Sequence, residues 1–179
     1  MDYEMKKQDD NCIITDLCNV ESIKIGFSFG AAEYYRKNAN FCPFGHICLC
    51  LKSDGTLFSE EYIAFYNQTS TPDGAITYSD GEDEGNDPYE EVFSIDLNRL
   101  PAEINELMFV VKDFLPEFSN HVVKLSSGAI QKQYDLPNKN RTKEPNTERV
   151  LIRLCRNSGW AVKACEDFYD IGSLMGNSG

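Results

Sequence analysis

Long apolar runs are missing from this sequence. No run approaches the ~20 consecutive apolar residues that a helix needs to cross a bilayer, so we expect no membrane insertion. The start of the chain, MDYEMKKQDD, also lacks the apolar centre of a secretion signal. We therefore expect a cytoplasmic protein whose seven cysteines stay reduced.

Sequence motifs of common enzymes are equally absent. There is no G-x-S-x-G, no H-E-x-x-H, no P-loop, and no G-x-G-x-x-G after a predicted strand. The two histidines, His46 and His121, both fall in runs that predict β-strands, where a structural role is expected. We therefore predict that the protein is not an enzyme.

Basic residues are missing between Lys52 and Arg99. The same stretch holds twelve acidic residues, which leaves 29 − 12 = 17 acids against 17 bases elsewhere. The whole net charge of −12 therefore lies in this middle segment. Because an acidic surface repels phosphate backbones and anionic lipids, we exclude nucleic acid and membrane surfaces as partners. Cations and basic proteins remain.

The apolar residues fall into short runs, bounded by turn signals such as SDG, PDG, SSG and NSG, at roughly ten-residue spacing. The runs cover residues 22–29, 46–52, 92–97, 107–114, 121–125, 130–136, 149–156 and 160–166. This pattern predicts an all-β fold, an antiparallel β-sandwich. One or two short helical turns are expected, at residues 59–66 and 101–107.

A cluster of soft metal ligands occurs in CPFGHICLC. It contains Cys42, His46, Cys48 and Cys50. All four residue types bind zinc or copper. Cys48 and Cys50, however, lie two apart on a predicted buried strand, where free cysteine packs like a small apolar residue. We favour a core role for this cluster and keep a metal or redox role as the alternative.

The densest acidic stretch is TYSDGEDEGNDPYEE, residues 77–91, with seven acidic residues among fifteen. Calcium takes about six to eight oxygen ligands, and a bound ion would relieve the repulsion between these carboxylates. The spacing from Asp80 to Glu91 approaches that of an EF-hand, but the flanks, GAITY and VFSIDL, predict strands where an EF-hand needs helices. On the residues alone, a calcium loop and a solvated acidic turn both remain open.

The centre of the chain resembles the TerD family of tellurium-resistance and general-stress proteins. Residues 65–111 combine FYN, PDG, the acidic stretch, IDL and LPAEI in the family's order. The resemblance continues through SIKIGFSF, SSGAIQKQYDL and TERVLIRLCRNSGWAVKACEDFYD. It implies a TerD-like β-sandwich domain over residues 20–175, preceded by an N-terminal extension, residues 1–19.

The resemblance also implies calcium binding. Anchored on IDL, the family's calcium loop aligns with residues 80–91 of this sequence. The ligand candidates carried over in this way are Asp80, Asp87, Glu90 and Glu91. The further local carboxylates are Glu82, Asp83 and Glu84.

The sequence departs from the family pattern around this loop. Residues that replace the family's loop glycines are Ser79, Glu84, Asn86 and Pro88, and Tyr89 replaces an acid. An acidic D-x-D on an earlier strand of the family falls here on Pro43 and Gly45. Half of the acidic constellation is missing, which predicts one calcium ion, held weakly or lost.

The resemblance leaves two main functions open. The first is a calcium-responsive stress-response domain that acts through other stress-response or TerD-type proteins, or through self-association. The second is a metal-free interaction domain whose acidic face, residues 54–96, docks a basic partner or the basic loop 139–143 of another copy. A third and weaker interpretation is direct tellurite or thiol chemistry at residues 42–50.

Overall fold

Apolar and polar side chains alternate along several of the predicted strands, which bury one face. Strand β2, Ser22–Phe29, shows the pattern: Ile23, Ile25 and Phe27 are buried, whereas Lys24 between them is exposed. The computed structural model describes residues 13–29, 46–80, 91–111, 120–128, 130–137, 148–164 and 167–169. All structural statements below concern these residues.

The described chain is built almost entirely of strands. In addition to β2, the elements are β1 (Ile13–Asp16), β3 (His46–Leu51), η1 (Glu60–Tyr62), β4 (Ile76–Asp80), β5 (Glu91–Asp96), β6 (Glu106–Val111), β7 (Asn120–Ser127), β8 (Ile130–Pro137), β9 (Glu148–Arg156), β10 (Trp160–Ala164) and β11 (Asp167–Tyr169). The expectation of an all-β antiparallel fold is confirmed.

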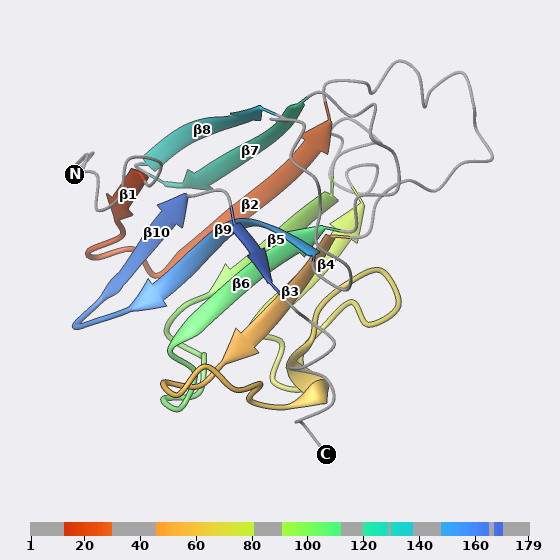
Figure 1. Ribbon diagram of the computed structural model, residues 1–179. Coiled ribbons are helices and arrows are strands. Elements are labelled where there is room, and N and C mark those ends of the chain that lie inside the picture. The colour runs from red at the N-terminus through yellow and green to blue at the C-terminus, as the bar shows by residue number, and fades with distance from the viewer. Residues whose placement is uncertain are drawn as a thin grey trace.

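Two antiparallel sheets face each other as a sandwich (Figure 1). The six-stranded sheet, called sheet A here, runs β1-β10-β9-β6-β3, with β11 also paired to β9. The five-stranded sheet, called sheet B, runs β4-β5-β2-β7-β8. The last strand of sheet A therefore lies at the same side of the sandwich as the first strand of sheet B.

The main core fills the space between the sheets. At its centre the rings of Phe27, Phe93 and Phe109 contact one another, with Phe93 edge-on to Phe109 at 5.3 Å between centroids. All three side chains are fully buried, and aromatic rings bury large apolar areas that dominate core energetics. Trp160, at the start of β10, is also part of this core.

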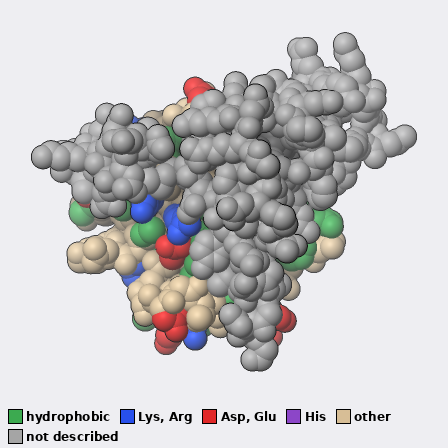
Figure 2. All heavy atoms as spheres, in the orientation of Figure 1, with side chains coloured by type: hydrophobic (Ala, Val, Ile, Leu, Met, Phe, Trp, Pro, Cys, Tyr) green, Lys and Arg blue, Asp and Glu red, His purple; other side chains and the backbone are tan. Residues whose placement is uncertain are grey.

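The outer face of sheet A is partly covered by the chain itself. The segment after β3 returns over β3 and β6, and its Leu57 and Ile63 pack against Leu49 and Met108 in a second, smaller apolar cluster. On the face seen in Figure 2, the described surface carries acidic, basic and apolar side chains in separate spots. The outer face of sheet B has no such apolar cluster among its described residues.

One of the two expected helical turns is absent, and strand β1 lies outside the runs that the sequence predicts. Helix is confined to the single 3-10 turn η1 inside 59–66, because residues 101–105 form only a turn in which Ile104 N donates to Pro101 O at 3.1 Å. Residues 13–16, assigned above to the extension, form β1 and pair with β10. No helix in the described ranges is long and apolar enough to cross a membrane.

Candidate functional site

The acidic stretch begins and ends on two neighbouring strands of sheet B. Strands β4 and β5 pair antiparallel from Ile76↔Ile95 to Asp80↔Glu91. The first and last acid of residues 80–91, called the acidic connection here, therefore form one cross-strand pair, which joins the two ends of this segment. The flanking strands confirm that this is not an EF-hand. The other predicted ligands, Glu82, Asp83, Glu84, Asp87 and Glu90, lie outside the described residues, as does the side chain of Asp80.

Glu91 faces the interior of the sandwich. Side chains alternate along β5, and because Phe93 and Ile95 are buried, the register places Glu91 on the same face. Its exposed fraction is only 3 %. A carboxylate in such a place is costly unless hydrogen bonds or charged partners compensate for the lost water.

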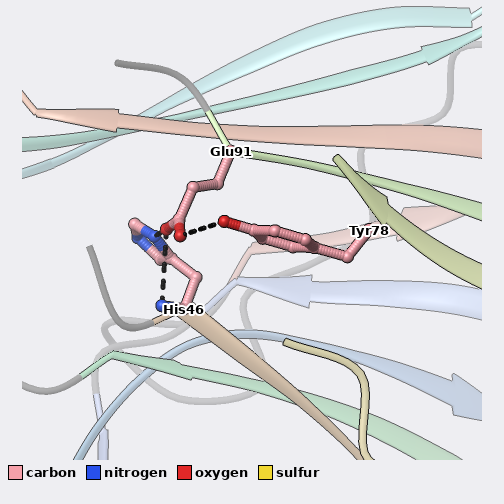
Figure 3. Close-up of polar contacts among 3 residues, drawn as sticks. All are labelled: His46, Tyr78 and Glu91. Carbon is pink, nitrogen blue, oxygen red and sulfur yellow. Dashed lines mark hydrogen bonds and ion pairs between the residues drawn. The ribbon is translucent and has the colours of Figure 1, made fainter. Parts of the chain in front are cut away.

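Protein groups supply that compensation (Figure 3). The Tyr78 hydroxyl, on β4, donates to Glu91 Oε1 at 2.6 Å. The other carboxylate oxygen, Oε2, contacts the imidazole Nδ1 of His46 and accepts a hydrogen bond from the His46 backbone N–H at 3.4 Å. Both oxygens of Glu91 are thus engaged by side chains from strands at this side of the sandwich.

The imidazole of His46 is itself held by the core. It stacks on the ring of Phe27 with 4.8 Å between centroids and 19° between planes, and it is 1 % exposed. His46 begins β3, at the edge of sheet A, while Glu91 and Tyr78 belong to sheet B. The three residues, called the His46–Glu91–Tyr78 cluster here, therefore join the two sheets at the end of β5 that begins with Glu91.

The sequence contained a signal for this arrangement. The period of two that predicts β5 extends back from Phe93 to Glu91 and assigns it to the buried face. Along β3, His46 lies two and four residues before the buried Cys48 and Cys50, so the same period of two assigns it to their face. The histidine was thus expected in a strand and structural, and the structure agrees. That it would meet Glu91 could not be read from either strand alone.

The cysteine cluster is resolved in part. Cys48 and Cys50 are both fully buried in the main core, which confirms the core interpretation for these two, and burial raises the pKa of the Cys48 thiol. Cys155, on β9, has its pKa raised to about 11, by burial first and then by Glu106, so it remains a protonated and unreactive thiol near neutral pH. Cys42 lies outside the described residues.

No metal centre is visible among the described residues, where no group of three or more His, Cys, Asp or Glu side chains lies close enough to hold an ion. Glu91 is consequently placed as an internal hydrogen-bond acceptor at the foot of the acidic connection. The hard oxygen donors of the remaining acids suit calcium by their chemistry.

Comparison with known proteins gives a consistent result. The TerD domain family model matches residues 1–172. The fold is similar to the crystal structure of a homologue of telluride resistance protein (TerD) from Streptomyces coelicolor A3(2), with a TM-score of 0.58 and 18 % identity over 85 % of this chain and 92 % of that one. It is also similar to the crystal structure of a protein of unknown function, with a TM-score of 0.54 and 16 % identity over 84 % and 91 % of the two chains.

Proposed function

This chain belongs to the TerD family, of the tellurium-resistance type, and we propose that it is a non-enzymatic stress-response domain that binds calcium through residues 80–91 and acts through partner proteins. One observation carries the calcium part: seven carboxylates lie in a segment whose two ends are held as the strand pair Asp80↔Glu91. Such closure lowers the entropy that the loop would lose on wrapping an ion.

In this proposal the carboxylates have two roles. Glu91, with both oxygens already engaged by His46 and Tyr78, anchors the connection to the core. Asp80, Asp87 and Glu90 are the main ligand candidates. The additional carboxylates, Glu82, Asp83 and Glu84, lie in the same connection. Calcium would offset the repulsion among them, which at physiological salt is screened only beyond about 8 Å.

A thermal melt of the full chain in calcium and in chelator tests the proposal. An ion that binds only the folded protein raises the melting temperature, by an amount that corresponds to about 2.7 kcal/mol at 100 times Kd. We expect a clear calcium-dependent rise that Asp80→Asn with Asp87→Asn abolishes. The matched control, Glu21→Gln with Glu103→Gln, removes the same charge from exposed sites elsewhere and should keep the rise.

Two outcomes would overturn calcium binding: no shift of the melting temperature at millimolar calcium, or the same shift in the Asp80/Asp87 variant as in the parent. Magnesium at equal concentration is the ionic control. Magnesium requires a tighter octahedral site and keeps its bound waters, so a calcium site should give a smaller shift with magnesium, whereas general screening of the acidic segment should give the same shift with both ions.

A second candidate function is a metal-free interaction domain with an acidic docking face. The observation that favours it is that Glu91 spends both oxygens on internal hydrogen bonds, while the family's upstream acids are replaced by Pro43 and Gly45. It predicts an association with a basic partner, or between copies, that weakens with salt and is unchanged by chelator. Association that disappears with EDTA would contradict it.

A further inference from the structure

One part of the outer face of sheet B carries a row of polar side chains. Along β2 the outward positions are Ser22, Lys24 and Gly26, which alternate with buried apolar residues. The strand registers align these positions with outward residues of the neighbouring strands. One cross-strand row crosses the sheet as Thr77, Ser94, Lys24, Ser126 and Gln131. Every residue of that row has a side chain that forms hydrogen bonds.

The neighbouring cross-strand row has no polar side chain at its centre. It runs Ser79, Val92, Gly26, Lys124 and Gln133. Because Gly26 carries no side chain and lies between larger neighbours, this row is low in the middle and high toward β7 and β8. The sheet surface is therefore hollowed beside Lys124.

Two adjoining hollows occupy this face, with volumes of about 470 and 420 Å³. They share Lys24, Ser126 and Gln131, so they form one groove. Each volume lies within the range of roughly 300–1,000 Å³ that is typical of small-molecule sites.

The larger hollow is rich in hydroxyl groups. Its lining includes Ser22, Thr77, Ser94, Ser126 and Ser127, with the carboxylate of Asp96 at one end. Hydroxyl, amide and carboxylate groups together can both donate to and accept from the hydroxyl groups of a ligand. We call it the hydroxyl hollow.

The smaller hollow is lined by lysines. Lys24 and Lys124 lie at outward positions of β2 and β7, Lys132 also lines the hollow, and no Asp or Glu is among its described lining residues. Lysine is a strong binder of phosphate groups as a point charge, and short hydroxyl side chains add donors beside it. We call it the lysine hollow.

We propose that the outer face of sheet B binds a small phosphorylated polyhydroxyl compound, of the sugar phosphate class. The phosphate lies in the lysine hollow, between Lys24 and Lys124, and the hydroxyl groups of the ligand lie along the hydroxyl hollow. None of the described residues that line either hollow is aromatic, which disfavours a ligand that depends on stacking of a nucleobase.

NMR titration of the full chain with glucose 6-phosphate, inorganic phosphate and glucose tests this proposal. We expect shifts of the amides around Lys24, Lys124 and Gln131, and tighter binding of glucose 6-phosphate than of either fragment. Lys24→Gln with Lys124→Gln should weaken glucose 6-phosphate by at least about tenfold, since charge-assisted hydrogen bonds to phosphate are lost. The matched control, Lys52→Gln with Lys163→Gln, removes two lysines that lie outside both hollows and should bind as the parent does.

A second variant separates the two hollows. Thr77→Val with Ser126→Ala removes hydroxyl groups and no charge, so it should reduce the preference for glucose 6-phosphate over inorganic phosphate. The proposal is overturned if the lysine control weakens binding as much as the Lys24/Lys124 variant, or if no ligand shifts these amides. Tighter binding of a glutamate-rich peptide than of glucose 6-phosphate would overturn it in favour of a protein partner. The calcium response of the Lys24/Lys124 variant should equal that of the parent, which keeps this test separate from the calcium test.

Discussion

The two open sides of the sandwich are closed by different polar contacts. At the side where β3 meets β4 and β5, the buried carboxylate of Glu91 joins the sheets through His46 of sheet A, and Tyr78 of its own sheet donates to it. At the opposite side, where β1 meets β8, the hydroxyls of Thr15 and Tyr134 share one hydrogen bond of 2.6 Å. Both contacts use a tyrosine hydroxyl from an edge strand of sheet B. They differ in whether the partner is a carboxylate or a neutral group.

This difference has an energetic consequence. A neutral hydrogen bond adds about 0.5–1.5 kcal/mol to stability, whereas one to a charged group adds about 1.5–3 kcal/mol. A buried carboxylate also carries a large desolvation cost, so its partners hold it in one place more strictly than a neutral pair would. The acidic connection thus begins and ends at the side of the sandwich where the polar contacts fix the side chains more strictly than the Thr15–Tyr134 pair does at the opposite side. A loop expected to gather several carboxylates benefits from a fixed base.

Removal of the carboxylate is expected to have the largest effect. Glu91→Ala removes the acceptor of the buried His46 imidazole and of the half-buried Tyr78 hydroxyl and opens a space beside Phe27, so we expect a loss of about 3–5 kcal/mol in the free energy of unfolding. Urea denaturation monitored by Trp160 fluorescence measures it. The control Glu103→Ala, at an exposed site, should stay within about 0.5 kcal/mol of the parent. A loss below about 1 kcal/mol for Glu91→Ala would contradict the structural role assigned here.

The strands that contribute to this comparison were largely predictable from the sequence, because each is a short apolar or alternating run bounded by turn signals. β2 was predicted with its observed bounds, and β3, β5, β9 and β10 to within one or two residues. β1 and β11 were not predicted. Each has four residues or fewer, too short for a period of two to be distinguished from chance.

The site was predictable only in part. The resemblance to the TerD family singled out Glu91, with Asp80, Asp87 and Glu90, among the acids, and the alternation of β5 shows that Glu91 faces inward. The partnership with His46 depends on how sheet A lies over sheet B, because the two positions are 45 residues apart in the chain. Strand patterns specify which face of a strand is buried, and leave open which residue of the other sheet lies opposite.

Loss of one hydroxyl on the carboxylate side should have an intermediate effect. Tyr78→Phe keeps the ring that packs edge-on to Phe93 and removes only the donor to Glu91, so we expect a loss of about 1.5–3 kcal/mol, the range for a hydrogen bond to a charged group. Tyr66→Phe is the matched control, because Tyr66 is 55 % exposed. An effect equal to that of this control would show that Glu91 does not depend on Tyr78.

The same substitution on the neutral side should have the smallest effect. Tyr134→Phe removes the partner of Thr15, and we expect a loss of about 0.5–1.5 kcal/mol in the free energy of unfolding, clearly below that of Tyr78→Phe. Adding Thr15→Val replaces the second polar atom by a methyl group of similar shape, so the double variant should regain part of the loss, since no buried hydroxyl then lacks a partner. A Tyr134→Phe effect as large as that of Tyr78→Phe would show that the charge of Glu91 adds nothing to its side of the sandwich. If Tyr78→Phe destabilises the fold more than Tyr134→Phe, the contribution of a tyrosine hydroxyl to stability depends on whether its partner is charged. The contact with Glu91 then stabilises the base of the acidic connection more strongly than the Thr15–Tyr134 pair stabilises the opposite side.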